Sequence, residues 1–483
     1  MPETRSATAL DPGRVLDYCR NRWETDLLAE LSAFIEARAI SPAYDAAWEA
    51  TGQLDAVADR AAQWIRAQGL AGAEVDVLRE PGRTPLVLVD VPGTAPDTES
   101  GTVLFYGHLD KQPAGEGWSA GRDPWIPHFD GTRLYGRGGA DDGYALYAAV
   151  AAIQAVDEQH APRPRCVGIF ETSEESGSPD LPFWLSRLES RIADVDLVVC
   201  LDSGAGDYDR LWLVTSLRGH CGGRLDVQVL DHGAHSGDAG GVVPSSFRIG
   251  RSLLDRLESS ATGEVRLGAA WCPIPDERIR QARTAAGVLG PAVAARFDWS
   301  GSTVPTTADG AEQLLNRAWR PSLAVTGADG LPAIADAGNV LRPSTSLKLS
   351  LRLPPQVDSR AALRALKALL ENDPPYGARV TFTPDTVVAD GWSAPPLEPW
   401  LERTLDRASR GYFDGAGLAM LGQGGTIPLM GMLSGLFPDA QFLACGVQGP
   451  GAGAHGPDES LHLPYTQRLT ASIAMVLAAT RHE

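Results

Sequence analysis

The pattern of apolar and polar residues in the N-terminal part of the chain predicts helices that alternate with buried strands. Helical periodicity covers residues 13–36 and 54–69, and an apolar helix is predicted to begin at Tyr144. Short continuous apolar runs, bounded by turn residues or by an acidic residue, predict strands at residues 86–91, 102–106, 166–170 and 197–201. This alternation predicts an α/β domain with a mixed, mostly parallel sheet flanked by helices.

A different pattern begins near Arg218 and predicts a second, smaller domain. Within residues 345–353 leucines alternate with polar residues, so one face of this strand is predicted to be buried and the other open. Residues 283–340 are rich in Ala, Gly and Pro and are predicted to be irregular. The predicted elements are a strand at 224–230, a helix at 245–257, a strand at 345–353, a helix at 359–372 and a strand at 379–388. This order predicts an inserted α+β domain of the ferredoxin-like kind.

The alternation of helices and apolar runs returns after residue 391, with an apolar run at 441–446 and a helix at 470–480. A catalytic domain interrupted by an inserted domain is therefore predicted. The first part of the catalytic domain is placed at 1–217, the inserted domain at 218–391 and the second part at 392–483. The length of 483 residues agrees, since it exceeds what one simple core usually accommodates.

Charge and cysteine usage narrow the classes of partner. The formal net charge of −19 argues against nucleic acid or an anionic membrane surface as a partner. The six cysteines are scattered without paired spacing, so we expect reduced thiols rather than disulfides or a zinc knuckle. The N-terminus shows no apolar signal core, and the longest apolar helical stretch, 144–156, is too short to cross a bilayer. These features predict a soluble, cytoplasmic protein.

The stretch F-E-T-S-E-E-S-G-S at 170–178 places two adjacent carboxylates, Glu174 and Glu175, directly after a predicted buried strand. Neighbouring carboxylates in a cleft repel each other unless a cation lies between them or one of them is protonated. An isolated pair of this kind is usually a solvated acidic loop. Its interpretation therefore depends on whether other segments supply ligands for a cation.

Side chains that could bind a cation follow several other predicted strands. In an open parallel sheet the carboxyl ends of the strands share one edge, so residues distant in the sequence converge there. The candidates are His108 and Asp110 after one strand, Asp141 in an Asp-Asp-Gly turn, Asp202 after another strand, and His455 in a glycine-rich loop. Imidazoles and carboxylates in these numbers suit two zinc-like cations that share a bridging carboxylate.

Six motifs carry, by their order and spacing, a resemblance to a known family. They are G-H-L-D at 107–110, G-R-G-G-A-D-D-G at 136–143, E-T-S-E-E-S-G-S at 171–178, L-D-S-G at 201–204, H-S-G at 235–237 and G-A-H-G-P-D-E-S at 453–460. Together they resemble the aminoacylase/carnosinase family of di-zinc metallopeptidases, in particular its carnosinase-like dipeptidases. The resemblance runs from about residue 20 to the C-terminus and implies an inserted lid where one is predicted above.

The resemblance implies a role for each candidate ligand. One ion would be held by His108, Asp141 and Asp202, and the other by Asp141, Glu175 and His455, with Asp141 bridging. The two divalent ions are expected to be Zn²⁺, with Mn²⁺ or Co²⁺ as alternatives. Asp110 would orient His108. Glu174 would be the general base that takes a proton from the attacking water and passes it to the leaving nitrogen.

The resemblance also implies roles for residues after Arg218. His235 would stabilise the tetrahedral oxyanion, often across a dimer, so a homodimer formed through the lid is expected. Arg352 would bind the substrate carboxylate with its bidentate fork, and a surface ion pair is the structural alternative. Contacts to the substrate backbone would come from Asn339, Gly424, Gly425 and Thr426, and a tight turn explains the glycines nearly as well.

Three positions depart from the family pattern and alter the wall around the substrate. Gly143 stands where carnosinase-like members usually have Lys or Asn, and Gly422 and Gln423 stand where they often have Arg and Glu. The leading hypothesis is a di-metal hydrolase that cleaves a dipeptide or dipeptide-like amide next to a free carboxylate. The second is an N-acyl-amino-acid deacylase that uses the same site.

Three other classes fit the sequence less well. A non-catalytic metal-binding scaffold would be expected to lack Glu174 or a ligand, and all are present. An oxidoreductase would need a glycine-rich phosphate loop, whereas the acids within 136–143 would repel a pyrophosphate. A serine hydrolase would need a nucleophile elbow between a strand and a helix, and Ser119 in G-W-S-A-G lies in a Gly/Pro/Trp-rich loop instead.

Overall fold

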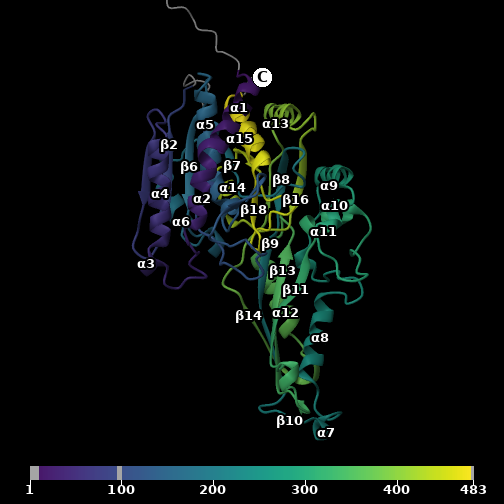
Figure 1. Cartoon of the computed structure of the whole chain (residues 1–483). Helices are drawn as coiled ribbons and strands as arrows, with labels where there is room; N and C mark the ends of the chain where they lie inside the picture. Colours follow the sequence, from purple (N-terminus) through teal and green to yellow (C-terminus); the bar gives the residue numbers. More distant parts are fainter. Residues whose placement is uncertain (1–9, 95–100, 480–483) are drawn as a thin grey trace, which may run out of the picture. The chain divides into compact units, whose positions relative to one another are not determined.

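The chain forms two compact units in a computed structural model that describes residues 10–94 and 101–479 (Figure 1). Unit 1 comprises Met1–Thr215, Ala394–Leu421 and Met432–Glu483, and unit 2 comprises Ser216–Ser393 and Gly422–Gly431. The predicted boundaries after residues 217 and 391 lie two residues from these divisions. The segment Gly422–Gly431 belongs to unit 2, whereas the sequence predicts it as part of the catalytic domain.

Two predictions concern, in part, residues outside the described ranges. Positions 1–9 of the N-terminal stretch without a signal core, and Thr480 at the end of the predicted C-terminal helix, lie outside the described residues. Every helix within the described ranges is too short or too polar to serve as a membrane span.

A six-stranded sheet with strand order β1-β2-β6-β3-β7-β17 forms the centre of unit 1. Its strands are β1 (Glu74–Leu78), β2 (Leu86–Val91), β3 (Thr102–His108), β6 (Arg165–Glu171), β7 (Val195–Cys200) and β17 (Gln441–Ala444). β6, β3, β7 and β17 run parallel, while β1 and β2 add antiparallel strands at one edge. The prediction of a mixed, mostly parallel sheet is confirmed, and the four predicted apolar runs form β2, β3, β6 and β7.

Helices pack against this sheet and against one another. α5 (Tyr144–Asp157) is buried along almost its whole length, contacts β3 and β6, and packs on α15 (Leu463–Leu477). α15 also packs on α1 (Pro12–Arg22), and Figure 1 shows the N-terminal helix in purple beside the C-terminal helix in yellow. The buried Trp23 Nε1 donates a 3.0 Å hydrogen bond to Thr470 Oγ1, which ties the first helical segment to the last.

Further helices complete the α/β layers. They are α2 (Leu28–Glu36), α3 (Trp48–Thr51), α4 (Gln53–Ala67), α6 (Leu181–Leu188), α13 (Pro399–Tyr412) and α14 (Pro428–Leu436). Smaller sheets consist of β15 (Trp392–Ser393), β8 (Trp212–Leu217) and β16 (Ala419–Gln423), and of β18 (Ser460–His462), β5 (Arg133–Tyr135) and β4 (His128–Phe129). The six cysteines are free thiols, as predicted, and all except Cys272 are buried.

A four-stranded antiparallel sheet with strand order β11-β13-β9-β14 forms the centre of unit 2. Its strands are β9 (Gly219–Gln228), β11 (Ser322–Asp329), β13 (Ser344–Leu353) and β14 (Arg379–Pro384). α8 (Ser246–Leu257) and α12 (Ser359–Glu371) pack on the face that buries the leucines of β13. The polar residues of β13 lie on the opposite face, so the predicted alternation is observed. A short ladder of β10 (Ala234–His235) and β12 (Val340–Leu341), followed by α7 (Ser236–Ala239) after β10, lies at one end of this unit (Figure 1).

The prediction that residues 283–340 are irregular is wrong. This segment contains the second half of α9 (Asp276–Leu289), all of α10 (Ala292–Ala295) and α11 (Gly310–Trp319), and the edge strand β11. α11 buries Leu314, Leu315 and Trp319, which are few enough to be masked by the surrounding Ala and Gly. β11 shows no apolar alternation because its last six residues are exposed at the edge of the sheet. The main sheet of unit 2 therefore has one more strand than predicted.

Candidate metal centre

The parallel strands of unit 1 position the predicted ligands at one edge of the sheet. β3 ends at His108, β7 ends two residues before Asp202, and β6 ends three residues before Glu174. Asp141 lies in the turn that leads into α5, and its peptide bond to Asp142 is cis. All of these positions follow the carboxyl ends of the strands or precede the next helix, which is where an open α/β sheet places its functional side chains.

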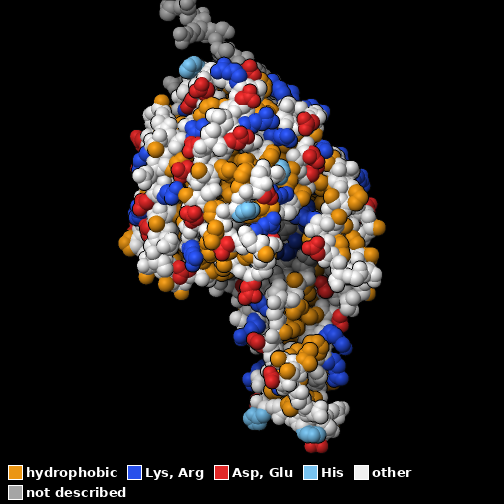
Figure 2. Space-filling view, in the orientation of Figure 1, with side chains coloured by type: hydrophobic (Ala, Val, Ile, Leu, Met, Phe, Trp, Pro, Cys, Tyr) orange, Lys and Arg blue, Asp and Glu red, His pale blue; other side chains and the backbone are white. Residues whose placement is uncertain are grey.

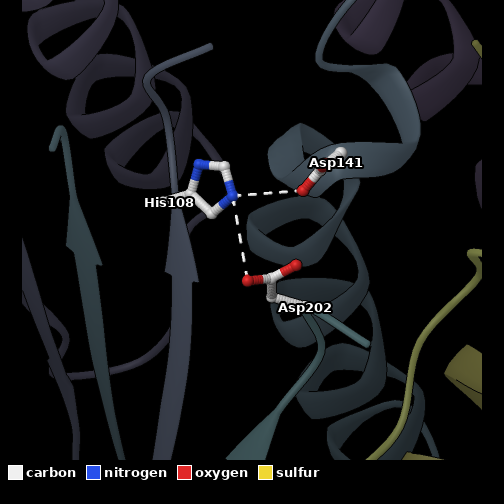
Figure 3. Close-up of side chains that lie close together, drawn as sticks. All are labelled: His108, Asp141 and Asp202. Atoms are coloured by element: carbon white, nitrogen blue, oxygen red, sulfur yellow. Dashed lines mark ion pairs between the residues drawn. The ribbon is translucent and has the colours of Figure 1, made fainter. Parts of the chain in front are cut away.

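The side chains converge into two groups that share Asp141. His108 Nε2 lies 3.4 Å from Asp141 Oδ1 and 3.9 Å from Asp202 Oδ2, and Figure 3 shows the three side chains pointing toward one another. On the other side, His455 Nε2 lies 3.0 Å from Asp141 Oδ2 and 3.2 Å from Glu175 Oε2. Within each group the potential ligand atoms all lie within 4.8 Å of one another. Each oxygen of Asp141 therefore faces a different imidazole.

The donor set and its charges fit a pair of divalent cations. His108 is fully buried, and its Nε2 has no hydrogen-bond partner among the residues that the structure describes. Burial, together with the Asp141 carboxylate, raises the pKa of Asp202 to about 7. Burial lowers the pKa of His108, but the carboxylates of Asp110 and Asp141 outweigh it and the net shift is upward. Carboxylates that retain protons and imidazoles that gain them indicate an acidic site that would bind metal in exchange for those protons.

Asp110 connects the two halves of the site. His108 Nδ1 lies 3.0 Å from the backbone carbonyl of Asp110 and 3.4 Å from its Oδ1, so the same residue orients the imidazole through both groups. The two oxygens of its carboxylate also accept hydrogen bonds from the backbone N–H groups of Glu174, at 3.1 Å, and Glu175, at 3.0 Å. The family resemblance implies the contact of Asp110 with His108, but the sequence does not predict its hydrogen bonds to the backbone of Glu174 and Glu175. Asp110 therefore fixes the position of the acidic pair as well as the first histidine.

The acidic pair is asymmetric. Burial and the carboxylate of Asp202 raise the pKa of Glu174 well above its ordinary value. Glu175 faces His455 and accepts a 2.6 Å hydrogen bond from Gln112 Nε2. Glu175 thus lies among hydrogen-bond donors, whereas the neighbouring carboxylates of Glu174 disfavour its ionisation.

Several supporting residues were not identified from the sequence. Glu459 accepts hydrogen bonds from the backbone N–H groups of residues 138, 140 and 141 and pairs at 2.7 Å with Arg137, so it supports the turn that carries Asp141. Glu171 accepts from the hydroxyls of Tyr106, Ser173 and Ser178 beneath the acidic pair. Both glutamates lie inside quoted motifs, but only the folded chain shows which donors reach them.

Gly143, one of the departures from the family pattern, is explained by close packing. A Cβ on this residue would lie 2.2 Å from a ring carbon of Phe34 and 2.7 Å from the carbonyl oxygen of Gly138. The buried Lys111 ammonium lies 4.1 Å from the centre of the same ring and donates to the carbonyls of Phe34, Ile35 and Ala37 at the end of α2. The space beside the Asp-Asp turn is therefore filled from α2 and from the segment after β3 rather than from position 143.

The predicted residues of the lid fall into two groups within unit 2. His235 is exposed in β10, where it pairs with Val340, and the backbone carbonyl of Asn339 accepts from the N–H of Ser236 at 3.0 Å. Arg352 lies near the other end of β13, and its Nη1 donates to Thr426 Oγ1 at 2.8 Å. The carbonyls of Gly424 and Gly425 accept from the side chain and the backbone of Arg218.

These two groups are well separated along the sheet. Arg352 lies eight positions after Ser344, the start of β13, which corresponds to about 26 Å of strand. The β10–β12 ladder adjoins the Ser344 end of that strand. His235 and Arg352 of one chain therefore do not face a common small ligand.

Unit 1 carries a His/carboxylate cluster at the carboxyl edge of a parallel sheet, buried at His108, Asp141 and Asp202 and open to solvent at His455. This fold and site define a metal-dependent hydrolase. The sequence profile described as "Peptidase family M20/M25/M40" matches residues 104–479, well over half of the chain. The chain belongs to this family, and it is an enzyme that hydrolyses C–N bonds of peptides. The resemblance drawn from the six motifs is confirmed.

Related proteins share much of the chain. A cysteinylglycine-S-conjugate dipeptidase from Corynebacterium striatum is 29% identical over 413 residues, which cover 83% of this chain and 86% of that protein. Human Beta-Ala-His dipeptidase is 27% identical over 363 residues, covering 72% of this chain and 68% of that protein. The crystal structure of human carnosine dipeptidase 1 has the same fold, with a TM-score of 0.73, 21% identity and coverage of 97% of this chain and 99% of that one.

Proposed function

We propose that the protein is a dipeptidase that uses two metal ions to cleave the amide bond next to a free carboxylate. The observation that carries the proposal is the pair of ligand groups that share Asp141, with Glu174 fixed beside them by the carboxylate of Asp110. The names of the relatives point to the same substrate class, since both proteins compared above are dipeptidases. The free thiols support a cytoplasmic location.

His108, Asp141 and Asp202 would hold one ion, and Asp141, Glu175 and His455 the other. Imidazole and carboxylate donors suit Zn²⁺, and Mn²⁺ or Co²⁺ accept the same donors. When bound, such a pair supplies Lewis acidity and lowers the pKa of water toward neutrality.

Glu174 would act as the proton carrier. It would accept a proton from the water that attacks the amide carbon and return it to the amide nitrogen as the C–N bond breaks. A buried carboxylate near other carboxylates has a raised pKa, so it binds the transferred proton more strongly than an exposed glutamate. The hydrogen bond from its backbone N–H to Asp110 keeps this carboxylate beside the ligands during the transfer.

Arg352 would bind the substrate carboxylate, with Asn339, Gly424, Gly425 and Thr426 contacting the substrate backbone. The Arg352 guanidinium is half-buried and has no carboxylate within ion-pair distance among the described residues, which leaves donors for an incoming anion. The described residues offer Arg352 no carboxylate for the surface ion pair that was the structural alternative.

His235 would stabilise the oxyanion from the partner subunit of a homodimer. Because His235 and Arg352 of one chain lie at opposite ends of unit 2, they can serve the same small substrate only if they come from different chains.

Figure 2 shows histidine side chains exposed at the end formed by β10 and α7, and hydrophobic side chains gathered over α8 and the adjoining part of unit 2. The exposed hydrophobic residues of this unit include Val242, Phe247, Val325, Leu331 and Ile334. Apolar side chains of this number on one unit support dimerisation through the lid.

Mixing two inactive variants tests this arrangement. A His235→Ala chain retains Glu174, and a Glu174→Gln chain retains His235, so a mixed dimer would contain one site in which both residues are native. We expect each variant alone to be nearly inactive and the refolded mixture to regain a measurable part of the wild-type rate. Lack of recovery in mixtures shown by native mass spectrometry to contain mixed dimers would contradict action across the dimer.

The substrate class is tested by a mass-spectrometric screen of protein loaded with zinc or manganese. The screen compares mixed dipeptides with N-acyl amino acids that carry the same C-terminal residues. We expect cleavage of dipeptides, and the N-terminal and C-terminal fragments identify the bond. Exclusive cleavage of the N-acyl amino acids would replace the proposal with a deacylase, and no cleavage of either set would contradict both.

A further inference from the structure

Four arginines of unit 2, named here the arginine cluster, come from separate parts of the chain. Arg218 follows β8, Arg296 follows α10, Arg317 lies in α11 and Arg352 lies near the end of β13. Only Arg352 belongs to the carboxylate-binding role described above. The other three contribute positive charge that this role does not use.

Arg352 and Arg218 are joined through one hydroxyl group. Arg352 Nη1 donates to Thr426 Oγ1 at 2.8 Å, and that hydroxyl donates to the backbone carbonyl of Arg218 at 2.6 Å. The Arg218 side chain donates to Ser322 Oγ at 2.8 Å and to the Gly424 carbonyl at 3.3 Å. Ser322 is the ladder partner of Arg352 on β11, so both guanidinium groups belong to the same end of the sheet.

Arg317 and Arg218 both lie close to residue 424, and their positions require a glycine there. A Cβ on Gly424 would lie 2.9 Å from Arg218 Nη2, 3.1 Å from the carbonyl oxygen of Arg317 and 3.3 Å from Arg317 Cγ. A larger residue would push the two arginines apart. Arg317 Nε is buried and has no hydrogen-bond partner among the described residues.

Neutral groups, rather than carboxylates, surround the cluster. In the described ranges, none of the four arginines lies within 4.0 Å of an Asp or Glu oxygen, although the chain carries 61 acidic residues. Other cations nearby are paired: Lys348 with Asp385, Arg224 with Asp226, and Arg320 with Glu312.

Burial and mutual repulsion disfavour the charged state of the arginines in this cluster. Burial and the neighbouring Arg352 lower the pKa of Arg218 to about 10. Burial, Arg296 and Arg218 lower the pKa of Arg317 to about 10. Half-buried like charges of this kind are normally compensated by an anion, and no described carboxylate lies within ion-pair distance of these residues.

We infer that Arg218 and Arg317 form a second anion-binding subsite beside Arg352, so that the preferred substrate ends in aspartate or glutamate. This inference rests on the proposed function and specifies its substrate. One carboxylate occupies the bidentate fork of a single guanidinium. A substrate with only its α-carboxylate would therefore leave Arg218 and Arg317 uncompensated, whereas an acidic side chain would supply the second negative charge a few bonds away.

The test compares isosteric dipeptides, Xaa-Glu with Xaa-Gln and Xaa-Asp with Xaa-Asn, where Xaa is the N-terminal residue accepted in the screen. We expect kcat/KM for the acidic peptide to exceed that for the amide by about tenfold or more, as for a charge-assisted hydrogen bond. In Arg317→Gln the preference should shrink by about tenfold through a higher KM for the acidic peptide, with little change for the amide. The matched control is Arg320→Gln, since Arg320 lies one turn away beside Glu312 and should not alter the preference.

Binding of free amino acids separates this inference from the proposed function. L-glutamate and L-glutamine are titrated against the wild-type protein and Arg317→Gln, with no hydrolysis required. Tighter binding of glutamate that is lost in the variant supports the subsite even if no dipeptide is cleaved. Equal binding of the two amino acids by the wild-type protein, or equal loss of both in the variant, overturns it. The comparison in the wild-type protein needs no variant to fold.

Discussion

Replacing Glu174 with glutamine is expected to lower kcat by about 10²–10⁴-fold while two metal ions per chain remain bound. Glutamine has nearly the same shape but cannot accept a proton, and the backbone N–H that donates to Asp110 is unchanged. The ligand groups around Asp141 do not include Glu174, so their metal content should persist. Steady-state kinetics on the best substrate of the screen, together with metal analysis of the same samples, would measure both quantities.

Glu189→Gln is the control for this prediction, because Glu189 is an exposed glutamate at the end of α6. That variant should retain wild-type kinetics. If Glu174→Gln turned over substrate at the wild-type rate, Glu174 would not be the proton carrier. If it lost metal as well as activity, the experiment would instead place Glu174 among the ligands.

Replacing Asp141 with alanine is expected to remove both metal ions. Its two oxygens face His108 and His455 separately, so both ligand groups lose a member at once. The replacement also leaves His108 Nε2 facing a single ligand carboxylate, Asp202, at 3.9 Å. Inductively coupled plasma mass spectrometry of dialysed protein would give the stoichiometry, and we expect activity to fall to background.

Asp202→Ala provides the comparison, since Asp202 belongs to one ligand group only. That variant should lose one ion before the other when the chelator concentration is raised. Two ions per chain in dialysed Asp141→Ala would rule out its bridging role. Equal behaviour of the two variants would show that the ions are bound as one unit rather than through separable groups.

The sequence predicts the catalytic unit well because the information there is local. Each buried strand is a continuous apolar run, and each ligand follows a strand end or a turn, so topology alone brings His108, Asp141 and Asp202 to the same edge. Residues that act through long-range hydrogen bonds are different. Glu459 reaches the turn of Asp141 from more than three hundred positions away, and no local pattern marks it as the acceptor.

The inserted unit shows the limits of periodicity. α11 carries a few buried residues in an Ala- and Gly-rich context, and β11 is exposed on most of its length, so neither gives a clear helical or strand period. The close approach of Arg218 and Arg317 to residue 424 depends further on the absence of a side chain at Gly424, which lies 107 positions after Arg317 and 206 positions after Arg218 in the sequence. Contacts of this kind follow from packing and not from pattern.

The pairing of the first and last segments of unit 1 has a consequence for synthesis of the chain. Most of unit 2 is continuous in sequence, from Ser216 to Ser393, so its sheet can form while later residues are still being made. Unit 1 must wait, because β17 pairs with β7, α15 packs on α1, and the loop of His455 lies between these two late elements. A ribosome-bound nascent chain would thus carry a folded unit 2 before its metal site is complete.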